Sequence, residues 1–301
     1  MISLGARLFG LLLRAYTYRR RKRHMSLSRT ERPRNGKYMP PRGMTFAVRS
    51  FGGTKTEIFS PPAVNGDLIV MFHGGGHTQG MNDIYRRFAA RLASAAMRDV
   101  YCIDYTPGDA LVYPSVHDEC FAAYKAIADS AKGRGVACIG DSFGAGLMLS
   151  CCLRLRDEGA PLPEKLVCVS CFADLAASGD SYRKNCYRDP MYALPRSQSF
   201  ADNERFVRRR TPYAGSNDVR DPYLSPAYAD FRGFPPMLIV CGEYETSESD
   251  NRMVASGMER AGAEVTVLEF EGMFHDFPYI APFLKESRKA MRAISDHIVR
   301  K

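Results

Sequence analysis

The sequence of 301 residues lacks a hydrophobic run long enough to cross a membrane. Its N-terminal apolar run, residues 8–13, is far shorter than the roughly 20 residues that a membrane-spanning helix needs. Arg7 and Arg14 flank this run, and a basic cluster at residues 19–23 follows without a small-residue cleavage site. We therefore expect neither a membrane-spanning segment nor a secretory signal.

Signatures of metal, nucleotide and disulfide chemistry are also missing. No glycine-rich phosphate loop ends in Lys and Ser or Thr, and nothing near the close pairs Cys151–Cys152 and Cys168–Cys171 resembles a four-ligand zinc site. The nine cysteines are odd in number, have no paired spacing, and fall partly inside predicted buried strands, as in proteins of a reducing cytoplasm. We expect no metal, no cofactor and a cytoplasmic protein. Internal repeats and low-complexity segments are absent as well.

The excess of positive charge belongs to one end of the chain. Residues 1–50 contain 13 Lys and Arg against one acidic residue, Glu31, which makes this segment +12, whereas the whole chain is +9 and the rest is therefore −3. An enzyme of nucleic acids is expected to distribute basic residues around its cleft. The charge pattern argues against a nucleic-acid substrate.

A serine turn is the most informative motif that is present. Residues 140–144 read Gly-Asp-Ser-Phe-Gly, between an apolar run at 136–139 and a helical pattern at 147–155. The pattern Gly-x-Ser-x-Gly in this setting predicts a strand, a sharp turn and a helix, with the serine hydroxyl raised above the sheet edge. On its own such a motif often marks an ordinary turn. Ser142 is the candidate nucleophile.

A glycine-rich loop upstream strengthens this interpretation. His73, Gly74, Gly75 and Gly76 follow the apolar run at 68–72. Glycines let the backbone approach a ligand closely and turn N–H groups inward, which an oxyanion hole requires. The motif is found at this place in lipases and esterases. We expect the three glycines to form an oxyanion hole.

A nucleophilic serine needs a base, and the chain order in this arrangement is serine, acid, histidine. Two histidines follow Ser142. His297 lies in a polar-faced helical stretch, whereas His275 lies in a loop directly after the strand-like run at 265–270. Loops at the carboxyl ends of strands carry the chemistry in α/β folds. His275 is the predicted base.

The acid should follow the preceding strand. The apolar run at 237–242 is followed by four carboxylates in one loop, of which Glu245 is the best placed. Glu248 and Asp250 look like the first turn of the next helix, where acidic residues interact favourably with the dipole. Glu245 is the predicted acid and Asp250 the second choice.

The strand pattern predicts an α/β fold with a mostly parallel sheet covered by helices on both faces. Two further strands near residues 45–48 and 55–59 come first, as an antiparallel edge. A chain of this length with 45% hydrophobic residues is sufficient for one such domain. The expected strands of the parallel sheet are apolar runs that alternate with helical patterns, at 68–72, 100–103, 136–139, 166–169, 237–241 and 265–270.

With these motifs the chain resembles the bacterial hormone-sensitive-lipase-like esterases, a family within the α/β-hydrolase fold. The resemblance extends from about Arg42 to the C-terminus. It is also carried by shorter motifs in the family's order, namely Asp104-Tyr105, Tyr113-Pro114, Asp118, residues 188–191 (Arg-Asp-Pro-Met) and residues 221–226 (Asp-Pro-Tyr-Leu-Ser-Pro).

The resemblance implies roles for several residues and also shows departures. It assigns the oxyanion hole to the N–H groups of Gly75, Gly76 and Phe143. Phe143 stands where the family usually has alanine, so its ring is expected to narrow the acyl pocket. Glu245 replaces the commoner aspartate, and His77 stands at a usually aromatic position, where we expect it to line the substrate pocket.

The resemblance also implies a lid, formed by the N-terminal arm and an insertion. We expect an arm at residues 1–44 and a catalytic domain at 45–301, with the lid insertion at about 174–214. Apolar residues of the arm at positions 4, 8, 11, 12 and 15 are spaced for one face of a helix. This helix either covers the active site or, as an alternative, rests on an anionic membrane through residues 1–24.

The function expected from these residues is hydrolysis of carboxylic esters through a Ser-His-Glu triad and an acyl-enzyme. The resemblance implies small-molecule esters with short to medium acyl chains, no cofactor, and pairing of two copies. Two alternatives stay open. One is a hydrolase of lipids, amides or acetylated metabolites at a membrane surface, since esters and amides share the same tetrahedral oxyanion. The other is a non-catalytic small-molecule binding protein on the same fold.

Overall fold

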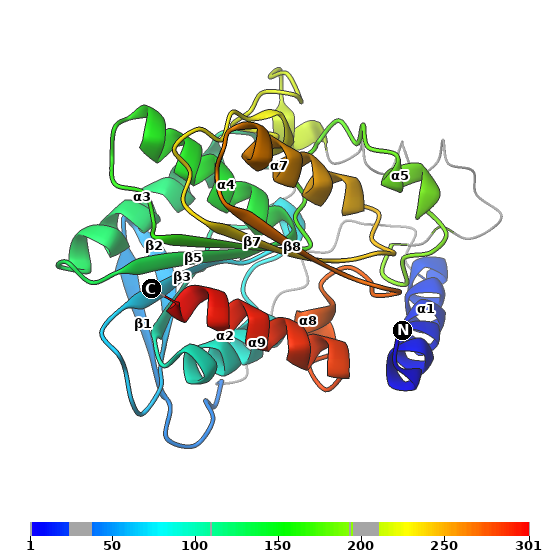
Figure 1. Cartoon of the computed structure of the whole chain (residues 1–301), viewed down its shortest axis with the longest axis horizontal. Coiled ribbons are helices and arrows are strands. Elements are labelled where there is room, and N and C mark those ends of the chain that lie inside the picture. The colour runs from blue at the N-terminus through cyan, green and yellow to red at the C-terminus, as the bar shows by residue number, and fades with distance from the viewer. Residues whose placement is uncertain (1, 24–37, 109, 193, 195–210, 301) are drawn as a thin grey trace.

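The apolar runs pair into one sheet. The computed structural model describes residues 2–23, 38–108, 110–192, 194 and 211–300. Within these residues eight strands form a single sheet in the order β1-β2-β4-β3-β5-β6-β7-β8 (Figure 1). The strands are β1 (Thr45–Phe51), β2 (Thr54–Ser60), β3 (Leu68–Phe72), β4 (Asp99–Ile103), β5 (Val136–Asp141), β6 (Lys165–Val169), β7 (Met237–Gly242) and β8 (Val265–Phe270).

The sheet is parallel except at one edge. The hairpin β1–β2 is antiparallel, β2 pairs antiparallel with β4, and every pair from β4 to β8 is parallel. The register places Phe72 beside Gly140 and Gly242 beside Phe270. The loops that follow β3, β5, β7 and β8 therefore begin side by side at one edge of the sheet, where the predicted functional residues lie.

Helices cover both faces of the sheet, as the alternating pattern predicts. α2 (Asp83–Ala96), α8 (Phe277–Ile280) and α9 (Lys285–Val299) pack on one face. α3 (Ser115–Ser130), α4 (Ser142–Asp157) and α7 (Glu248–Arg260) pack on the other (Figure 1). Each face has its own cluster of buried apolar side chains, one centred on α4 and the other on α2. The α/β fold with a mostly parallel sheet is confirmed.

Short elements and one long helix lie at the carboxyl edge of the strands. The short helices α5 (Ser181–Lys184) and η2 (Thr211–Ala214) belong to the predicted lid insertion, of which residues 195–210 lie outside the described residues. The other short turns are η1 (Gly76–Thr78) and η3 (Pro226–Tyr228). The division into an arm at 1–44 and a catalytic domain at 45–301 stays a prediction.

The N-terminal helix α1 (Leu4–Arg23) docks beside this edge (Figure 1). Phe9 stacks on Phe274 with ring centroids 5.8 Å apart, and the Thr17 hydroxyl donates to the Pro190 carbonyl at 2.8 Å. Both the N–H and the hydroxyl of Ser3 donate to the Glu286 carboxylate. The leucine face that the sequence marks as apolar points instead to solvent. Among the described residues no helix is both long and apolar enough to span a bilayer.

Candidate active site

The turn around Ser142 is built by two glycines that leave no room for side chains. A Cβ on Gly144 would lie 2.2 Å from the Phe72 carbonyl oxygen, and one on Gly140 would lie 2.6 Å from the Ala145 Cα. Ser142 itself has φ 51, in the left-handed region that non-glycine residues rarely adopt. β5 thus turns abruptly into α4, and Ser142 stands at the apex as the sequence predicts.

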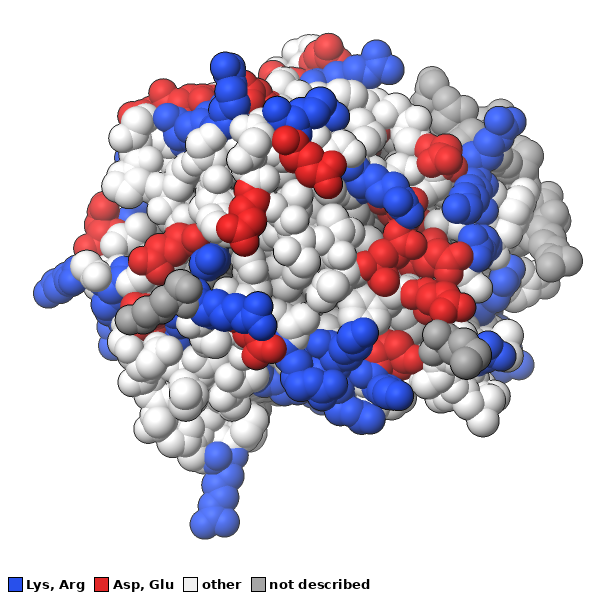
Figure 2. Space-filling view, viewed as in Figure 1, with Lys and Arg blue, Asp and Glu red and all other residues white. Residues whose placement is uncertain are grey.

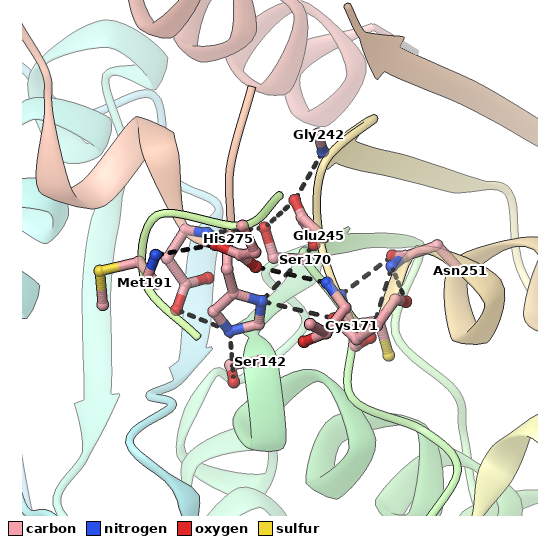
Figure 3. A network of polar contacts seen from close by, with 12 residues as sticks. Ser142, Ser170, Cys171, Met191, Gly242, Glu245, Asn251 and His275 are labelled. Carbon is pink, nitrogen blue, oxygen red and sulfur yellow. Dashed lines mark hydrogen bonds and ion pairs between the residues drawn. The ribbon is translucent and has the colours of Figure 1, made fainter. Parts of the chain in front are cut away.

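His275 lies against Ser142. Its Nε2 is 2.9 Å from the Ser142 Oγ, although the two residues are 133 positions apart (Figure 3). The loop that carries His275 approaches β7 closely, because a Cβ on Gly242 would lie 2.4 Å from the carbonyl of Met273. The predicted nucleophile and base are therefore within hydrogen-bond reach, the geometry that general-base activation requires.

Glu245 stands on the opposite side of the imidazole. Its Oε2 is 3.5 Å from the His275 Nδ1 (Figure 3). Its Oε1 accepts hydrogen bonds from the Gly242 N–H at 2.5 Å and from the Ser170 hydroxyl at 2.8 Å. These two donors hold the fully buried carboxylate in place, with the second oxygen directed at the ring.

Asp250, the second choice of acid, is engaged elsewhere, and His297, the histidine not chosen as base, lies away from the site. The Asp250 carboxylate accepts hydrogen bonds from the N–H groups of Ala173 and Asp174 and from the Tyr182 hydroxyl, at 2.9 to 3.0 Å. It thus connects the segment after β6 to the start of α7. His297 lies in the last turn of α9. Neither residue joins the cluster of Ser142, His275 and Glu245.

The glycine loop lies beside the serine turn. Gly75 and Gly76 have φ 91 and φ 59, so both use the conformational freedom of glycine. The buried Tyr105 hydroxyl lies within hydrogen-bond distance of the carbonyls of His73 and Gly74, at 3.1 and 3.0 Å, and shares its one proton between them. The Gly74 N–H donates to the Asp141 carboxylate at 3.0 Å, so this N–H is already used. Of the three predicted oxyanion donors in the loop, Gly75 and Gly76 remain.

Phe143 packs in a group of rings next to the nucleophile. Its ring is buried and meets Tyr213 edge-on at 5.5 Å between centroids. His77 stacks on the same tyrosine at 4.7 Å and lies 6.0 Å from Phe143. Phe143 and His77, the two predicted pocket residues, therefore lie together.

Tyr213 and His117 complete this group, and sequence reasoning missed both. The Tyr213 hydroxyl lies 2.7 Å from the His117 Nδ1, and burial lowers the pKa of His117 to about 3. A neutral histidine results, which suits an apolar wall. The two residues are 96 positions apart. No periodic pattern connects them.

Asp276 and Ser170 were also missed by sequence reasoning. The Asp276 Oδ2 lies 3.3 Å from the His275 Nε2. The backbone N–H of Asp276 donates to the Ser170 hydroxyl at 2.9 Å. Ser170 thus connects Asp276 with Glu245. The position of Asp276 directly after the predicted base was a signal in the sequence, but nothing there indicated which way its carboxylate points.

The pKa of His275 reflects opposing influences. Burial alone would lower it, but the charge of Asp276, Tyr192, whose ring lies 5.0 Å away, and the Glu245 carboxylate 3.5 Å from Nδ1 raise the pKa well above 6.5. The site therefore favours an imidazolium, the species that forms when serine gives up its proton.

A metal-dependent arrangement has no counterpart in the described part of the chain. No group of three or more His, Cys, Asp or Glu side chains there is placed to hold a metal ion. The cysteines, all buried, include four that lie in β4 to β7 as predicted, where they pack as small apolar side chains.

Comparison with known proteins relates the chain to hydrolases of the α/β-hydrolase fold. A sequence model of a family with the α/β-hydrolase fold matches residues 69–279. An acetyl-hydrolase of Streptomyces hygroscopicus is 32% identical over 245 residues, which cover 81% of this chain and 79% of that protein. A protein of Mycobacterium tuberculosis named as a putative acetyl-hydrolase, LipR, is 31% identical over 83% of this chain and 79% of its own length.

A solved structure extends the similarity to three dimensions. The crystal structure of a hormone-sensitive lipase from a metagenome library superposes with a TM-score of 0.84 and 26% sequence identity, over 99% of both chains. The matched region includes the glycine loop, the serine turn and the histidine loop.

Proposed function

Since the chain belongs to the α/β-hydrolase family of hormone-sensitive-lipase-like esterases and is a serine ester hydrolase, we propose that it cleaves short- to medium-chain acyl esters through Ser142, His275 and Glu245. The observation that carries the assignment is the 2.9 Å contact between the His275 Nε2 and the Ser142 Oγ, with Glu245 at the other ring nitrogen. This is the relative placement of nucleophile, base and orienting acid in serine hydrolases.

The reaction proceeds by acyl transfer. The Ser142 Oγ attacks the ester carbonyl while its proton passes to the His275 Nε2, and Glu245 stabilises the imidazolium. N–H groups of Gly75, Gly76 and Phe143 stabilise the oxyanion. The imidazolium then protonates the leaving alcohol. Water activated by His275 attacks the acyl-enzyme, and the acid is released from Ser142.

The group of rings around Phe143 supports a preference for short acyl chains. The buried Phe143 ring stands beside the nucleophile and is held by the rings of Tyr213, His77 and His117. Displacing close-packed rings to make room for a longer acyl chain costs a few kcal/mol of free energy. Acetyl or butyryl groups therefore fit better than long chains. The names of the Streptomyces and Mycobacterium relatives, acetyl-hydrolase and putative acetyl-hydrolase, agree with this size.

The test is hydrolysis of p-nitrophenyl esters of increasing acyl length by the purified protein. Activity is expected to be greatest on short chains and to disappear in Ser142→Ala. Ser150→Ala is the matched control, because Ser150 is also buried on α4 but lies outside the site. Equal activity of Ser142→Ala and the wild type would refute the assignment. Absence of turnover on every ester would favour a narrow natural substrate or a binding role.

A second proposal concerns where the enzyme acts. The outer face of α1 exposes Leu4, Leu8, Leu11 and Leu12, with 54 to 72% of each residue accessible to solvent. Arg7 and Arg19 are also exposed on this helix, and the basic cluster forms its C-terminal end. Exposed leucines next to basic residues are typical of helices that lie on anionic membranes. We propose that α1 holds the enzyme on such a surface.

Vesicle sedimentation tests this second proposal. The wild type should sediment with phosphatidylglycerol vesicles and less with phosphatidylcholine vesicles. Replacement of Leu8 and Leu12 by Glu should abolish sedimentation without reducing turnover of a soluble ester. If the protein sediments with neither kind of vesicle, and the double replacement converts a dimer into a monomer, the leucine face is instead a contact between two copies.

A further inference from the structure

The Asp276 carboxylate competes for the ring nitrogen that Ser142 uses. Its Oδ2 lies 3.3 Å from the His275 Nε2, compared with 2.9 Å for the Ser142 Oγ. Glu245, by contrast, approaches Nδ1 on the opposite side of the ring. The imidazole is therefore placed between two carboxylates, one at each nitrogen.

The backbone holds Asp276 in this place. The residue has φ 56, in the left-handed region that aspartate and asparagine tolerate better than most side chains. Its N–H donates to the Ser170 hydroxyl, which in turn donates to Glu245. The carboxylate is largely buried, and its Oδ1 has no hydrogen-bond partner within the described structure. Asp276 is thus fixed next to the ring by the residue that also anchors Glu245.

Other titratable groups face His275 from the surrounding elements. Asp189 and Tyr192 approach from the segment after α5, and Asp141 from the end of β5. The Asp141 pKa is raised well above its ordinary value, by burial first and then by the charge of Asp276. Asp276 is the carboxylate among these that lies at ion-pair distance from Nε2.

We propose that Asp276 is a positioning residue that stabilises the imidazolium of His275 through Nε2 and so sets the pH range in which His275 can accept the Ser142 proton. This inference rests on the proposed function of the site. It adds a second carboxylate to the control of the base, at the nitrogen that exchanges the proton.

The electrostatics of the two protonation states explain the effect. In neutral His275 with the proton on Nδ1, the lone pair of Nε2 faces the Asp276 carboxylate, which is unfavourable. In the imidazolium, the Nε2–H faces the same carboxylate, and an opposite charge at this distance favours the charged form. Burial opposes this effect. Ester hydrolysis should therefore lose activity on acidification already above pH 6.5, the ordinary pKa of histidine.

Asp276→Asn is the informative variant, because asparagine has the same shape and tolerates the left-handed backbone. In full-length protein, the His275 Cε1–H resonance is assigned by its loss in His275→Gln and is followed by NMR as a function of pH. We expect the titration midpoint to fall by about 1 to 3 pH units. Asp83→Asn, on the exposed side of α2, removes one negative charge far from the site and should leave the midpoint unchanged.

The pH dependence of kcat/KM provides a second measurement of the same effect. The acidic limb of kcat/KM for p-nitrophenyl acetate should move to lower pH in Asp276→Asn by the same amount as the midpoint. An unchanged His275 midpoint would overturn the proposal, as would a lower activity with an unchanged pH profile. If the wild type hydrolyses no ester, the proposed function fails while the NMR titration still tests Asp276. Asp276→Gly, which also accepts φ 56, replaces the asparagine variant if that variant does not fold.

Discussion

Two acidic residues after β7, Glu245 in the loop and Asp250 in the first turn of α7, have different roles, although the sequence offers both as the acid. Glu245 directs one oxygen at His275, whereas Asp250 receives three hydrogen bonds from elsewhere. Glu245→Gln should lower kcat by roughly 10²- to 10⁴-fold, because an amide stabilises the imidazolium poorly. Thermal stability and kcat measured on the same preparations check this.

Asp250→Asn serves as the matched comparison. It places an amide N–H₂ or a weaker acceptor against two backbone N–H groups, so it should lower stability by about 1 to 3 kcal/mol. The folded fraction should retain most of its kcat. The opposite result, with Asp250→Asn inactive though folded and Glu245→Gln active, would move the acid to Asp250.

Phe143 permits a prediction about specificity. Phe143→Leu opens space beside the nucleophile, so the ratio of hexanoate to acetate ester turnover should rise by roughly tenfold or more. Phe234→Leu is the control, since Phe234 is a buried ring that contacts Phe231 away from the site. The control should lose stability and keep its preference for chain length. A rise of similar size in both variants would show that general loosening, not Phe143, limits the chain.

Some site residues could be predicted from sequence because each follows a recognisable strand. Ser142 and His275 stand directly after apolar runs, and parallel strands bring the ends of such runs to one edge. Tyr213 and Asp276 could not be found in this way. The position of Tyr213 depends on where an irregular segment folds back, and the role of Asp276 depends on the direction of one side chain, which neighbouring loops determine.

At the scale of elements, strands were easier to predict than the orientation of a helix. Buried parallel strands are apolar on both faces, so their runs are evident. In α1 the leucines at positions 4, 8, 11 and 12 mark a face, but the protein packs the opposite one, with Ala6, Phe9 and Leu13. Both faces of α1 carry apolar side chains. Periodicity alone could not decide which face docks.

The contact of Ser3 with Glu286 gives a prediction for α1. Burial would raise the pKa of Glu286, but hydrogen bonds from Ser3 outweigh it and lower the pKa. A depressed pKa means that the contact stabilises docking above pH 4.5 and that this contribution is lost as the pH falls through the lowered value. Glu286→Gln should therefore loosen α1 at neutral pH.

Limited proteolysis measures this loosening. Trypsin should cut at Arg7 or Arg14 several-fold faster in Glu286→Gln than in the wild type, because cleavage follows local opening. Trypsin should cut Glu259→Gln, a control variant at an exposed position on α7, at the same rate as the wild type. Equal rates in all three proteins would show that the packing of Phe9, not Ser3, holds the helix.

At the scale of the whole molecule, charge is divided unevenly along the chain. The first 50 residues carry +12 and the remaining residues −3. On the face shown in Figure 2, acidic and basic side chains are interspersed. A basic, leucine-bearing arm on a slightly acidic enzyme is suited to an anionic surface, because the arm is attracted while the body is not.

Salt dependence separates the two contributions to the proposed membrane binding, the basic residues and the leucines. Raising salt from about 0.1 M to about 1 M shortens the Debye length from about 10 Å to about 3 Å. Each basic residue near the surface contributes about 1 kcal/mol at physiological salt. Sedimentation with phosphatidylglycerol vesicles should therefore fall by at least about tenfold in affinity over this range, since the loss of two such contributions already exceeds 1.4 kcal/mol. If binding to the vesicles strengthens or stays constant as salt is raised, the leucines alone account for that binding. Turnover of a soluble ester should be nearly the same at both salt concentrations, because the triad lies in a buried site that salt screens weakly.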